Sequence, residues 1–202
     1  MLPGRSLSLV RILKPHSDFD AIAQRVRQLR PLAAPWQGTV FRSVRPKYWG
    51  SQDFLTGEAS RQYGGRWNAP SSFRVVYLSL SLDTALEEVK GWSRTYGLPP
   101  EAALPRVFAA IEADLSETLD LTDGAIRQRL QVSLERMTRE DWRGANERGR
   151  ESLTQAIGRA AFDAEFEALV VPSAQDPECG NLLVFPDKLL ARSKLQELGA
   201  FE

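Results

Sequence analysis

The sequence predicts a single domain of mixed α/β or α+β class. The chain has 202 residues, a length that suits one domain. Its apolar fraction of 43% is enough for a hydrophobic core. Strand and helix patterns alternate irregularly along it, with no internal repeat and no low-complexity tract, and this order favours a mixed class.

The first predicted element is a helix at residues 17–30, which Ser17 or Asp18 can cap. Pro31 ends it. Four apolar residues between these limits follow helical spacing, namely Phe19, Ile22, Val26 and Leu29.

The first predicted strand, residues 39–44, is rich in β-forming residues and alternates in polarity. The segment at 45–72 follows, with glycines, prolines and several aromatic residues. Long loops in compact domains are usually functional or disordered, and this composition argues against disorder. We therefore expect the segment to contribute to function.

The rest of the chain continues the mixed pattern. Ser81 or Asp83 can cap the helix that follows the second strand, and Ser152 with Gln155 fits a capping box at the start of the last helix. The predicted strands are 73–80, 106–115, 166–172 and 181–185, and the predicted helices are 83–92, 123–148 (polar) and 152–165.

The charge balance gives no sign of a nucleic-acid or membrane partner. Lysine and arginine together number 26, as do aspartate and glutamate, so no bulk field attracts a polyanion. No apolar run approaches membrane-spanning length. The N-terminus lacks the uninterrupted apolar core and small-residue cleavage site of a secretory signal, so we expect a cytoplasmic protein.

Scarce cysteine and histidine exclude several chemistries. Cys179 is the single cysteine, so neither an internal disulfide nor a cysteine-rich zinc cluster is possible. A Ser-His-Asp triad would rest on the single histidine, His16, which is better explained as incidental near a helix N-cap. Any chemistry must then come from Arg, Glu, Asp, Tyr, Ser and backbone groups, and we expect no metal.

The string GGRWN at 64–68 has two interpretations. Gly64 and Gly65 permit backbone conformations closed to other residues, so the turn could bring amides and the Arg66 guanidinium to an anion such as a phosphate. It could instead be a tight turn with Arg66 solvated or ion-paired and Trp67 anchored in the core. From this string alone the second interpretation is favoured.

Three further residues are ambiguous on the sequence alone. Arg42 lies between Phe41 and Ser43 in a strand and more commonly would face solvent. Tyr48 is either a core residue or a ring on which a flat ligand stacks. Ser173 follows a predicted strand, where both active-site and ordinary turn residues occur.

Helix geometry separates two adjacent glutamates. At about 100° per residue, Glu87 points roughly 160° away from the centre of the apolar arc of helix 83–92, into solvent. Glu88 lies roughly 95° from that centre, at the edge of the core, where either a cleft or a boundary salt bridge could be.

Taken in order, these positions resemble the RES family, named for an arginine, a glutamate and a serine. Arg42, Glu88 and Ser173 fit the name. Tyr48, GGRWN and Asn181 followed by an apolar strand match further family positions, and YLSLSLDTALEE matches a pattern that ends at Glu88, with Ser79 in place of an alanine. The match runs from about residue 40 to the C-terminus, so we interpret 1–38 as a helical N-terminal extension and 39–202 as the RES domain.

The resemblance implies a fold similar to that of ADP-ribosyltransferases and a toxin that consumes NAD+ by cleaving nicotinamide from ribose. It implies catalytic roles for Glu88, Arg42 and Ser173, and NAD+ binding by Tyr48, Arg66, Trp67 and Asn181, without a cofactor. The implied partner is an Xre-type helix-turn-helix antitoxin, through which DNA would be reached only indirectly. The alternatives are a protein ADP-ribosyltransferase that uses NAD+ as donor and a non-catalytic binding module.

Overall fold

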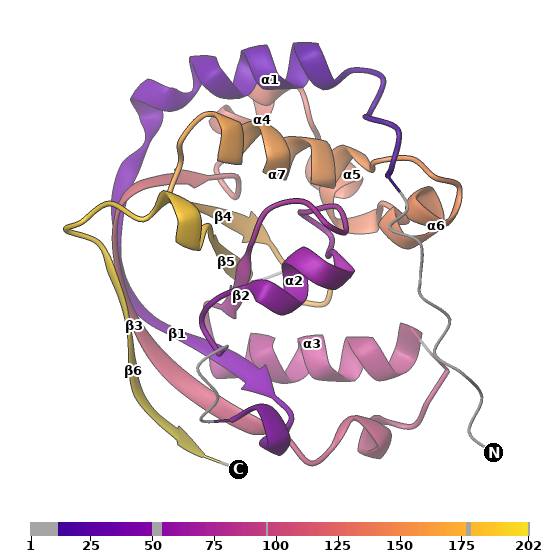
Figure 1. Cartoon of the computed structure of the whole chain (residues 1–202), viewed down its shortest axis with the longest axis vertical. Helices are drawn as coiled ribbons and strands as arrows, with labels where there is room; N and C mark the ends of the chain where they lie inside the picture. The colour runs from indigo at the N-terminus through magenta and orange to yellow at the C-terminus, as the bar shows by residue number, and fades with distance from the viewer. Residues whose placement is uncertain (1–11, 50–53, 96, 177–178, 202) are drawn as a thin grey trace.

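A computed structural model describes residues 12–49, 54–95, 97–176 and 179–201 (Figure 1). The strands are β1 (Ala34–Val44), β2 (Val76–Ser79), β3 (Val107–Asp120), β4 (Ala168–Pro172), β5 (Gly180–Val184) and β6 (Lys194–Phe201). The helices are α1 (Phe19–Gln28), α2 (Glu58–Tyr63), α3 (Leu82–Thr95), α4 (Gly124–Leu130), α5 (Leu134–Arg139), α6 (Trp142–Glu147) and α7 (Leu153–Asp163). Short 3-10 turns are η1 (Arg30–Leu32), η2 (Pro46–Tyr48), η3 (Pro100–Ala103) and η4 (Pro186–Lys188).

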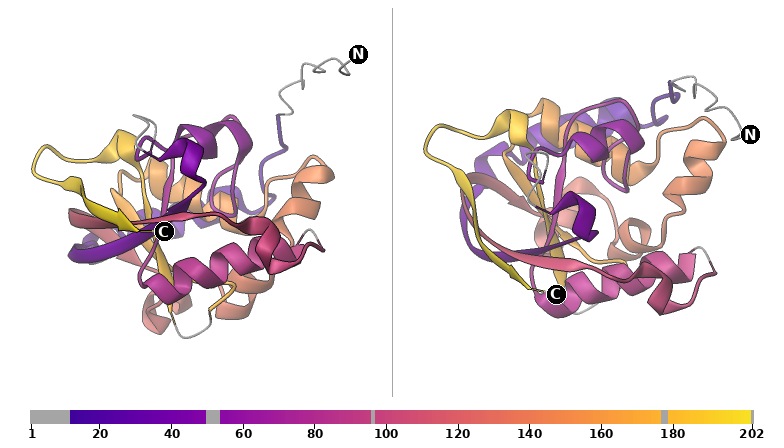
Figure 2. Two further views of the ribbon diagram at one scale, coloured as in Figure 1. Left: turned by 90° about the horizontal axis from the view of Figure 1, so that it is seen from below. Right: turned by 60° about the horizontal axis from the view of Figure 1, so that its bottom comes forward.

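Five of the strands close into a circuit. β1 pairs antiparallel with β3 along most of its length and meets β2 at Phe41 and Ser79. β2 continues to β5, β5 to β4, and β4 returns to β3 through a parallel pairing. β6 adds antiparallel to β3 outside this circuit (Figures 1 and 2). The mixed class predicted from the sequence is confirmed.

Helices cover the strands on opposite sides (Figure 1). α1 and α7 lie together above β4 and β5, where Val26, Leu29 and Ile157 are almost completely buried in the largest core cluster. α3 lies below, packed through Ala85 and Val89. None of the described helices combines the length and the apolar character that crossing a membrane requires.

The N-terminal helix is built into the domain. Its apolar face belongs to the same core cluster as α7 and β4, and β1 begins at Ala34, five residues before the strand predicted at residue 39. A backbone bridge between Lys14 and Arg150 and a hydrogen bond from the His16 amide to Glu151 (3.0 Å) hold the preceding segment. Removal of residues 12–33 would therefore expose core surface.

Other boundaries differ from the sequence predictions for local reasons. The continuous helix expected at 123–148 is three short helices, because Gln131 adopts a left-handed conformation (φ 59°) and Glu140 is extended. Ser133 and Asp141 then cap new helices through hydrogen bonds from Arg136 N and Gly144 N. The segment at 45–72 contains α2, and β6 was not predicted at all.

Candidate active site

A cavity of about 510 Å³ lies between α3, the β2–β5 strands, the GGRWN turn and α6. Its volume is in the range of about 300–1,000 Å³ typical of small-molecule and cofactor sites. Its charged lining residues are one carboxylate and four guanidinium groups: Glu88, Arg42, Arg66, Arg106 and Arg143. Such a wall suits a ligand that carries negative charge.

Glu88 is the carboxylate of this cavity and is held by two side chains. Its Oε1 accepts hydrogen bonds from Ser173 Oγ (2.8 Å) and Asn181 Nδ2 (2.9 Å). The Asn181 Oδ1 accepts in turn from Ser79 Oγ (3.0 Å), across the β2–β5 pair in which these two residues are opposite each other. The carboxylate is therefore fixed in position while it faces the cavity.

Ser173 lies behind the cavity wall. It is only 2% exposed and is not among the residues that line the cavity, whereas its neighbours Pro172 and Ala174 are. Its Oγ donates to Glu88 and accepts from the amides of Gln175 and Asp176 (both 3.0 Å). Ser173 therefore holds the Glu88 carboxylate from behind the wall and does not itself line the cavity.

Glu87 points away from the cavity, as its helical angle predicts. It forms ion pairs with Lys90 (2.7 Å) and Arg94 (3.6 Å) on the outer surface of α3. The hydrogen bond from Lys90 is the main reason that the pKa of Glu87 lies below its usual range. Ser81 caps the helix by accepting from Thr84 N (3.0 Å), which fixes the register that separates the two glutamates.

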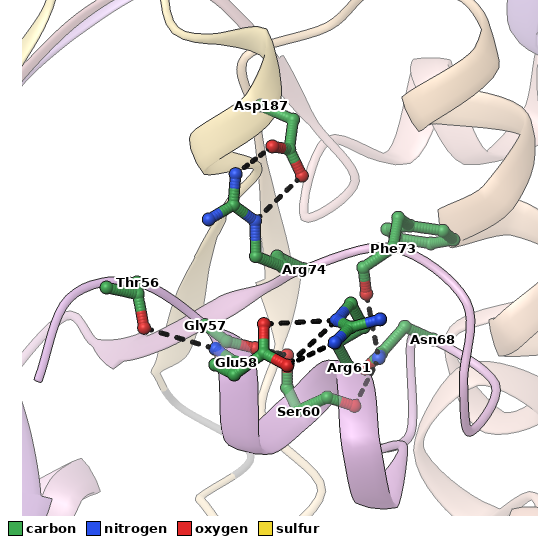
Figure 3. Close-up of polar contacts among 9 residues, drawn as sticks. All are labelled: Thr56, Gly57, Glu58, Ser60, Arg61, Asn68, Phe73, Arg74 and Asp187. Carbon is green, nitrogen blue, oxygen red and sulfur yellow. Dashed lines mark hydrogen bonds and ion pairs between the residues drawn. The ribbon is translucent and has the colours of Figure 1, made fainter. Parts of the chain in front are cut away.

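The GGRWN string forms a tight turn closed by a backbone bridge between Gly65 and Asn68. Gly64 has φ 72°, and a Cβ there would lie 2.8 Å from the ring of Pro70, so the position requires glycine. Asn68 is completely buried and donates to the carbonyls of Ser60 (2.7 Å) and Phe73 (3.3 Å), as Figure 3 shows. The Asn68 side chain therefore ties the turn to α2 and to the segment that leads into β2.

α2 and its flanks are held by local polar contacts (Figure 3). Ser60 Oγ donates to the Val75 carbonyl (2.7 Å) and accepts from the Val75 amide (2.8 Å). Ion pairs of Arg61 with Glu58 and of Arg74 with Asp187 lie on the surface around this contact. The part of this segment from Gly57 onward, which the sequence suggested was loop, is thus a frame that holds the turn.

α7 supports the same turn from the other side. Gln155 Nε2 donates to the carbonyls of Gly65 (2.9 Å) and Asn68 (3.3 Å), and Gln155 also completes the capping box with Ser152. Trp67 is 2% exposed and packs in the main core cluster with α7, although it also borders the cavity. Trp67 is therefore chiefly a core anchor, and its contribution to ligand binding remains a prediction.

Arg66 leaves the turn toward the α5–α6 connection. Its Nη1 donates to the carbonyls of Met137 and Glu140 (both 3.1 Å), so it is neither freely solvated nor simply ion-paired. Burial lowers the pKa of Arg66, and the negative charges of Glu88 and Glu140 oppose that shift. A guanidinium has five N–H donors, so two bonds from Nη1 leave others to face the cavity.

Arg42 faces the cavity from β1 and not the solvent. Its Nη1 is buried and has no hydrogen-bond partner within the described residues. The guanidinium lies over the ring of Phe54 (5.4 Å to the centroid), and burial lowers the pKa of Arg42 to about 10. A buried cation with an unused donor is suited to an anionic ligand group.

The remaining predicted residue is Tyr48, which lies in η2 directly after β1. Its side chain falls outside the part of the chain that the structure describes, so its role in NAD+ binding stays a prediction. His16 accepts from the Asp18 amide through Nδ1 (3.1 Å) just before α1, whose N-cap is Asp18, in agreement with an incidental histidine near a helix N-cap. Within the described ranges no group of three His, Cys, Asp or Glu residues could hold a metal.

Sequence reasoning did not single out Arg106, Trp142 or Arg143, all of which line the cavity. Arg106 donates through Nε to the Ala103 carbonyl (2.9 Å), and burial lowers its pKa. Trp142 and Arg143 stand at the start of α6. Their only sequence signal was a tryptophan in a polar segment, which by itself does not distinguish a cavity wall from a surface.

Comparison with known proteins identifies the family of this chain. The RES domain family model matches residues 39–200. The proteins called NAD(+) phosphorylase MbcT from Mycobacterium bovis and Mycobacterium tuberculosis are each 29% identical over 142 residues, which is 69% of either chain. The crystal structure of the M. tuberculosis MbcT–MbcA toxin–antitoxin complex matches with a TM-score of 0.71 at 24% identity, covering 90% of this chain and 91% of that one. The chain belongs to the RES domain family.

Proposed function

We propose that the protein is an NAD+-consuming toxin of a toxin–antitoxin pair that cleaves the nicotinamide–ribose bond. The observation that carries the proposal is the cavity itself, in which a fixed Glu88 carboxylate is the single acidic lining residue among four arginines. The relatives named NAD(+) phosphorylase MbcT support the same reaction class.

The electrostatics of the site fit cleavage of an N-glycosidic bond. As the C1″–N bond breaks, its electron pair leaves with nicotinamide, which departs neutral, and positive charge develops on the ribose. A fixed carboxylate stabilises such a cation without reorganising. Glu88 meets this need because Ser173 and Asn181 hold it before substrate arrives. No general acid is required for a neutral leaving group.

The arginines of the cavity would bind the two phosphates of NAD+. Arg42 and Arg66 both line the cavity, and the Arg42 Nη1 has no hydrogen-bond partner within the described residues. Guanidinium groups bind phosphate oxygens in a forked geometry. Tyr48 would pack on nicotinamide. Asn181 would orient two groups, the ribose of the substrate and the Glu88 carboxylate. Ser173 acts through Glu88, because its hydroxyl is buried behind the wall.

The acceptor of the ADP-ribosyl group is phosphate or water in this proposal, and the relatives' name favours phosphate. With phosphate, an oxygen of HPO₄²⁻ forms the new bond to C1″ while nicotinamide leaves, and the products are nicotinamide and ADP-ribose-1″-phosphate. With water, the products are nicotinamide, ADP-ribose and a proton. Transfer to a protein acceptor would instead leave ADP-ribose on a side chain.

The proposal predicts metal-independent turnover. Purified protein without a partner should release nicotinamide from NAD+ at an unchanged rate in excess EDTA, because the inferred chemistry uses Glu88 and arginines alone. Chromatography of the products with and without phosphate would identify the acceptor. Intact NAD+ after long incubation with phosphate, water and lysate protein as acceptors would contradict the enzymatic function and favour a binding module.

The partner we propose is an Xre-type helix-turn-helix antitoxin that inhibits the protein by covering the mouth of the cavity. We expect both proteins to be in the cytoplasm, where unrestrained NAD+ cleavage would stop growth. The complex of MbcT with MbcA supports a proteinaceous partner. We expect a neighbouring gene to encode this helix-turn-helix protein. Its co-expression should restore growth and suppress nicotinamide release by the purified complex. Unchanged toxicity with each neighbouring gene would contradict this prediction.

A further inference from the structure

The cavity has a second functional end, on α6. Trp142 and Arg143 both line it, and the Arg143 guanidinium lies over the Trp142 ring at 4.2 Å from the centroid. Neither residue belongs to the motifs that identify the family in this sequence. No acidic side chain within the described ranges forms an ion pair with Arg143, so its charge is not neutralised by the protein there.

α6 is a short helix, and its neighbours hold it in place. Asp141 caps it by accepting from Gly144 N (2.9 Å). Asn146 Nδ2 donates to Gln155 Oε1 (2.7 Å), which joins α6 to the residue that also supports the GGRWN turn. Arg66 binds the two carbonyls just before the helix, those of Met137 and Glu140. The two lining side chains therefore project from a fixed platform.

Arg66 connects the two ends of the cavity. It lines the cavity together with Glu88, Trp142 and Arg143, and its Nη1 donates to the Glu140 carbonyl, two residues before Trp142. The charges of Glu88 and Arg143 both influence the pKa of Arg66, in agreement with this placement. A ligand that extends from Glu88 along the Arg66 side of the cavity therefore reaches the Trp142–Arg143 pair. For a dinucleotide with its reacting ribose at Glu88 and its phosphates at the arginines, the group that arrives there is the distal nucleoside.

We propose that Trp142 and Arg143 form the subsite for the adenine of NAD+. Planar purines stack on indole rings and on guanidinium planes. Because the Arg143 guanidinium lies over one face of the Trp142 ring, the surfaces left for a purine are the outer plane of the guanidinium and the opposite face of the indole. The inference rests on the proposed function, because it takes NAD+ as the ligand. It also gives Arg66 a second role, since its Nη1 positions the platform while its other donors face the phosphates.

The test compares ligands with and without the adenosine half. Trp142→Ala should raise the KM for NAD+ by about 5- to 150-fold, the range for loss of one stacked base, and leave kcat nearly unchanged. ADP-ribose binding, measured by calorimetry, should weaken by the same factor. Turnover or binding of nicotinamide mononucleotide, which lacks the adenosine half, should be unaffected.

Three further variants make the result specific. Trp142→Phe keeps an aromatic face and should restore most of the affinity for ADP-ribose. Arg143→Ala should weaken ADP-ribose binding, whereas Arg139→Ala, which removes an exposed arginine outside this cavity, should not. Thermal melting of each variant checks the fold.

Two results would overturn the subsite. One is an equal loss of binding for ADP-ribose and nicotinamide mononucleotide in Trp142→Ala, which would indicate a general structural role. The other is unchanged ADP-ribose binding in Trp142→Ala. A wild-type protein that binds ADP-ribose through Trp142 but never cleaves NAD+ would instead refute the proposed catalysis and leave the subsite standing.

Discussion

Glu88→Gln is expected to lower the rate of nicotinamide release from NAD+ by about 10²- to 10³-fold, the usual effect of removing one preorganised electrostatic group. Glutamine keeps the size of the side chain and can still accept from Ser173 and Asn181, so the cavity shape is preserved. What is lost is the negative charge that faces the ribosyl cation. Steady-state kinetics and growth on induction both measure the effect.

Glu87→Gln is the matched control for this variant. The residue is adjacent and chemically identical, but its carboxylate pairs with Lys90 and Arg94 on the outer face of α3. Surface substitutions usually change stability by no more than about 0.5 kcal/mol, so turnover and toxicity should stay near wild type. A dead Glu87→Gln variant, or full activity in Glu88→Gln, would show that the catalytic carboxylate has been assigned wrongly.

The placement of Glu88 could be predicted because helical periodicity depends only on local sequence. Ala85 and Val89 form the buried face of α3, and the angle of about 100° per residue then puts Glu88 at the edge of that face and Glu87 opposite it. The capping box of α7 was predictable for the same reason, since both of its hydrogen bonds join residues three apart. Local patterns thus gave the helices and their buried faces.

Properties that depend on distant partners could not be predicted. Arg42 looked like a solvent-facing residue of an alternating strand, but the closed circuit of strands turns that face of β1 toward the cavity. Ser173 was expected at the catalytic centre, yet the amides of Gln175 and Asp176 and the carboxylate of Glu88 surround its hydroxyl behind the wall. The groups that surround Arg42 and Ser173 include residues far away in the sequence, so their positions depend on the fold.

The breaks that make α6 a separate helix at the cavity, and the whole of β6, were missed for different physical reasons. The three-helix segment has no continuous apolar stripe, because capping residues interrupt it every few positions, and so nothing marked Trp142 and Arg143 as a cavity wall. β6 is an edge strand with mostly exposed residues that pairs with β3, and its stability comes from that pairing rather than from a strand-like sequence. Neither pattern carries the periodicity on which sequence reasoning depends.

The close contact between α7 and the GGRWN turn gives the second large effect. A Cβ on Gly158 would overlap the carbonyl oxygen of Trp67 and lie 2.9 Å from its carbonyl carbon. Both groups are backbone, so no side-chain rotation relieves the overlap, and either α7 or the turn must shift. Overpacking of this kind costs about 1–3 kcal/mol and occasionally more. Gly158→Ala should therefore destabilise the domain although alanine is the better helix former.

The control is Gly124→Ala, at the first position of α4, where a Cβ would meet only the Arg127 guanidinium at 3.7 Å. There the higher helix propensity of alanine, up to about 1 kcal/mol, should leave stability unchanged or raise it. For Gly158→Ala we expect the melting temperature to fall by roughly 2–12 °C, since 1 kcal/mol corresponds to about 2–4 °C in a domain of this size. Turnover of NAD+ should fall as well, because a displaced turn moves Arg66 relative to Glu88. Equal melting temperatures for the two variants would contradict the close approach of α7 to Trp67, and with it the explanation of how this turn is fixed at the edge of the cavity.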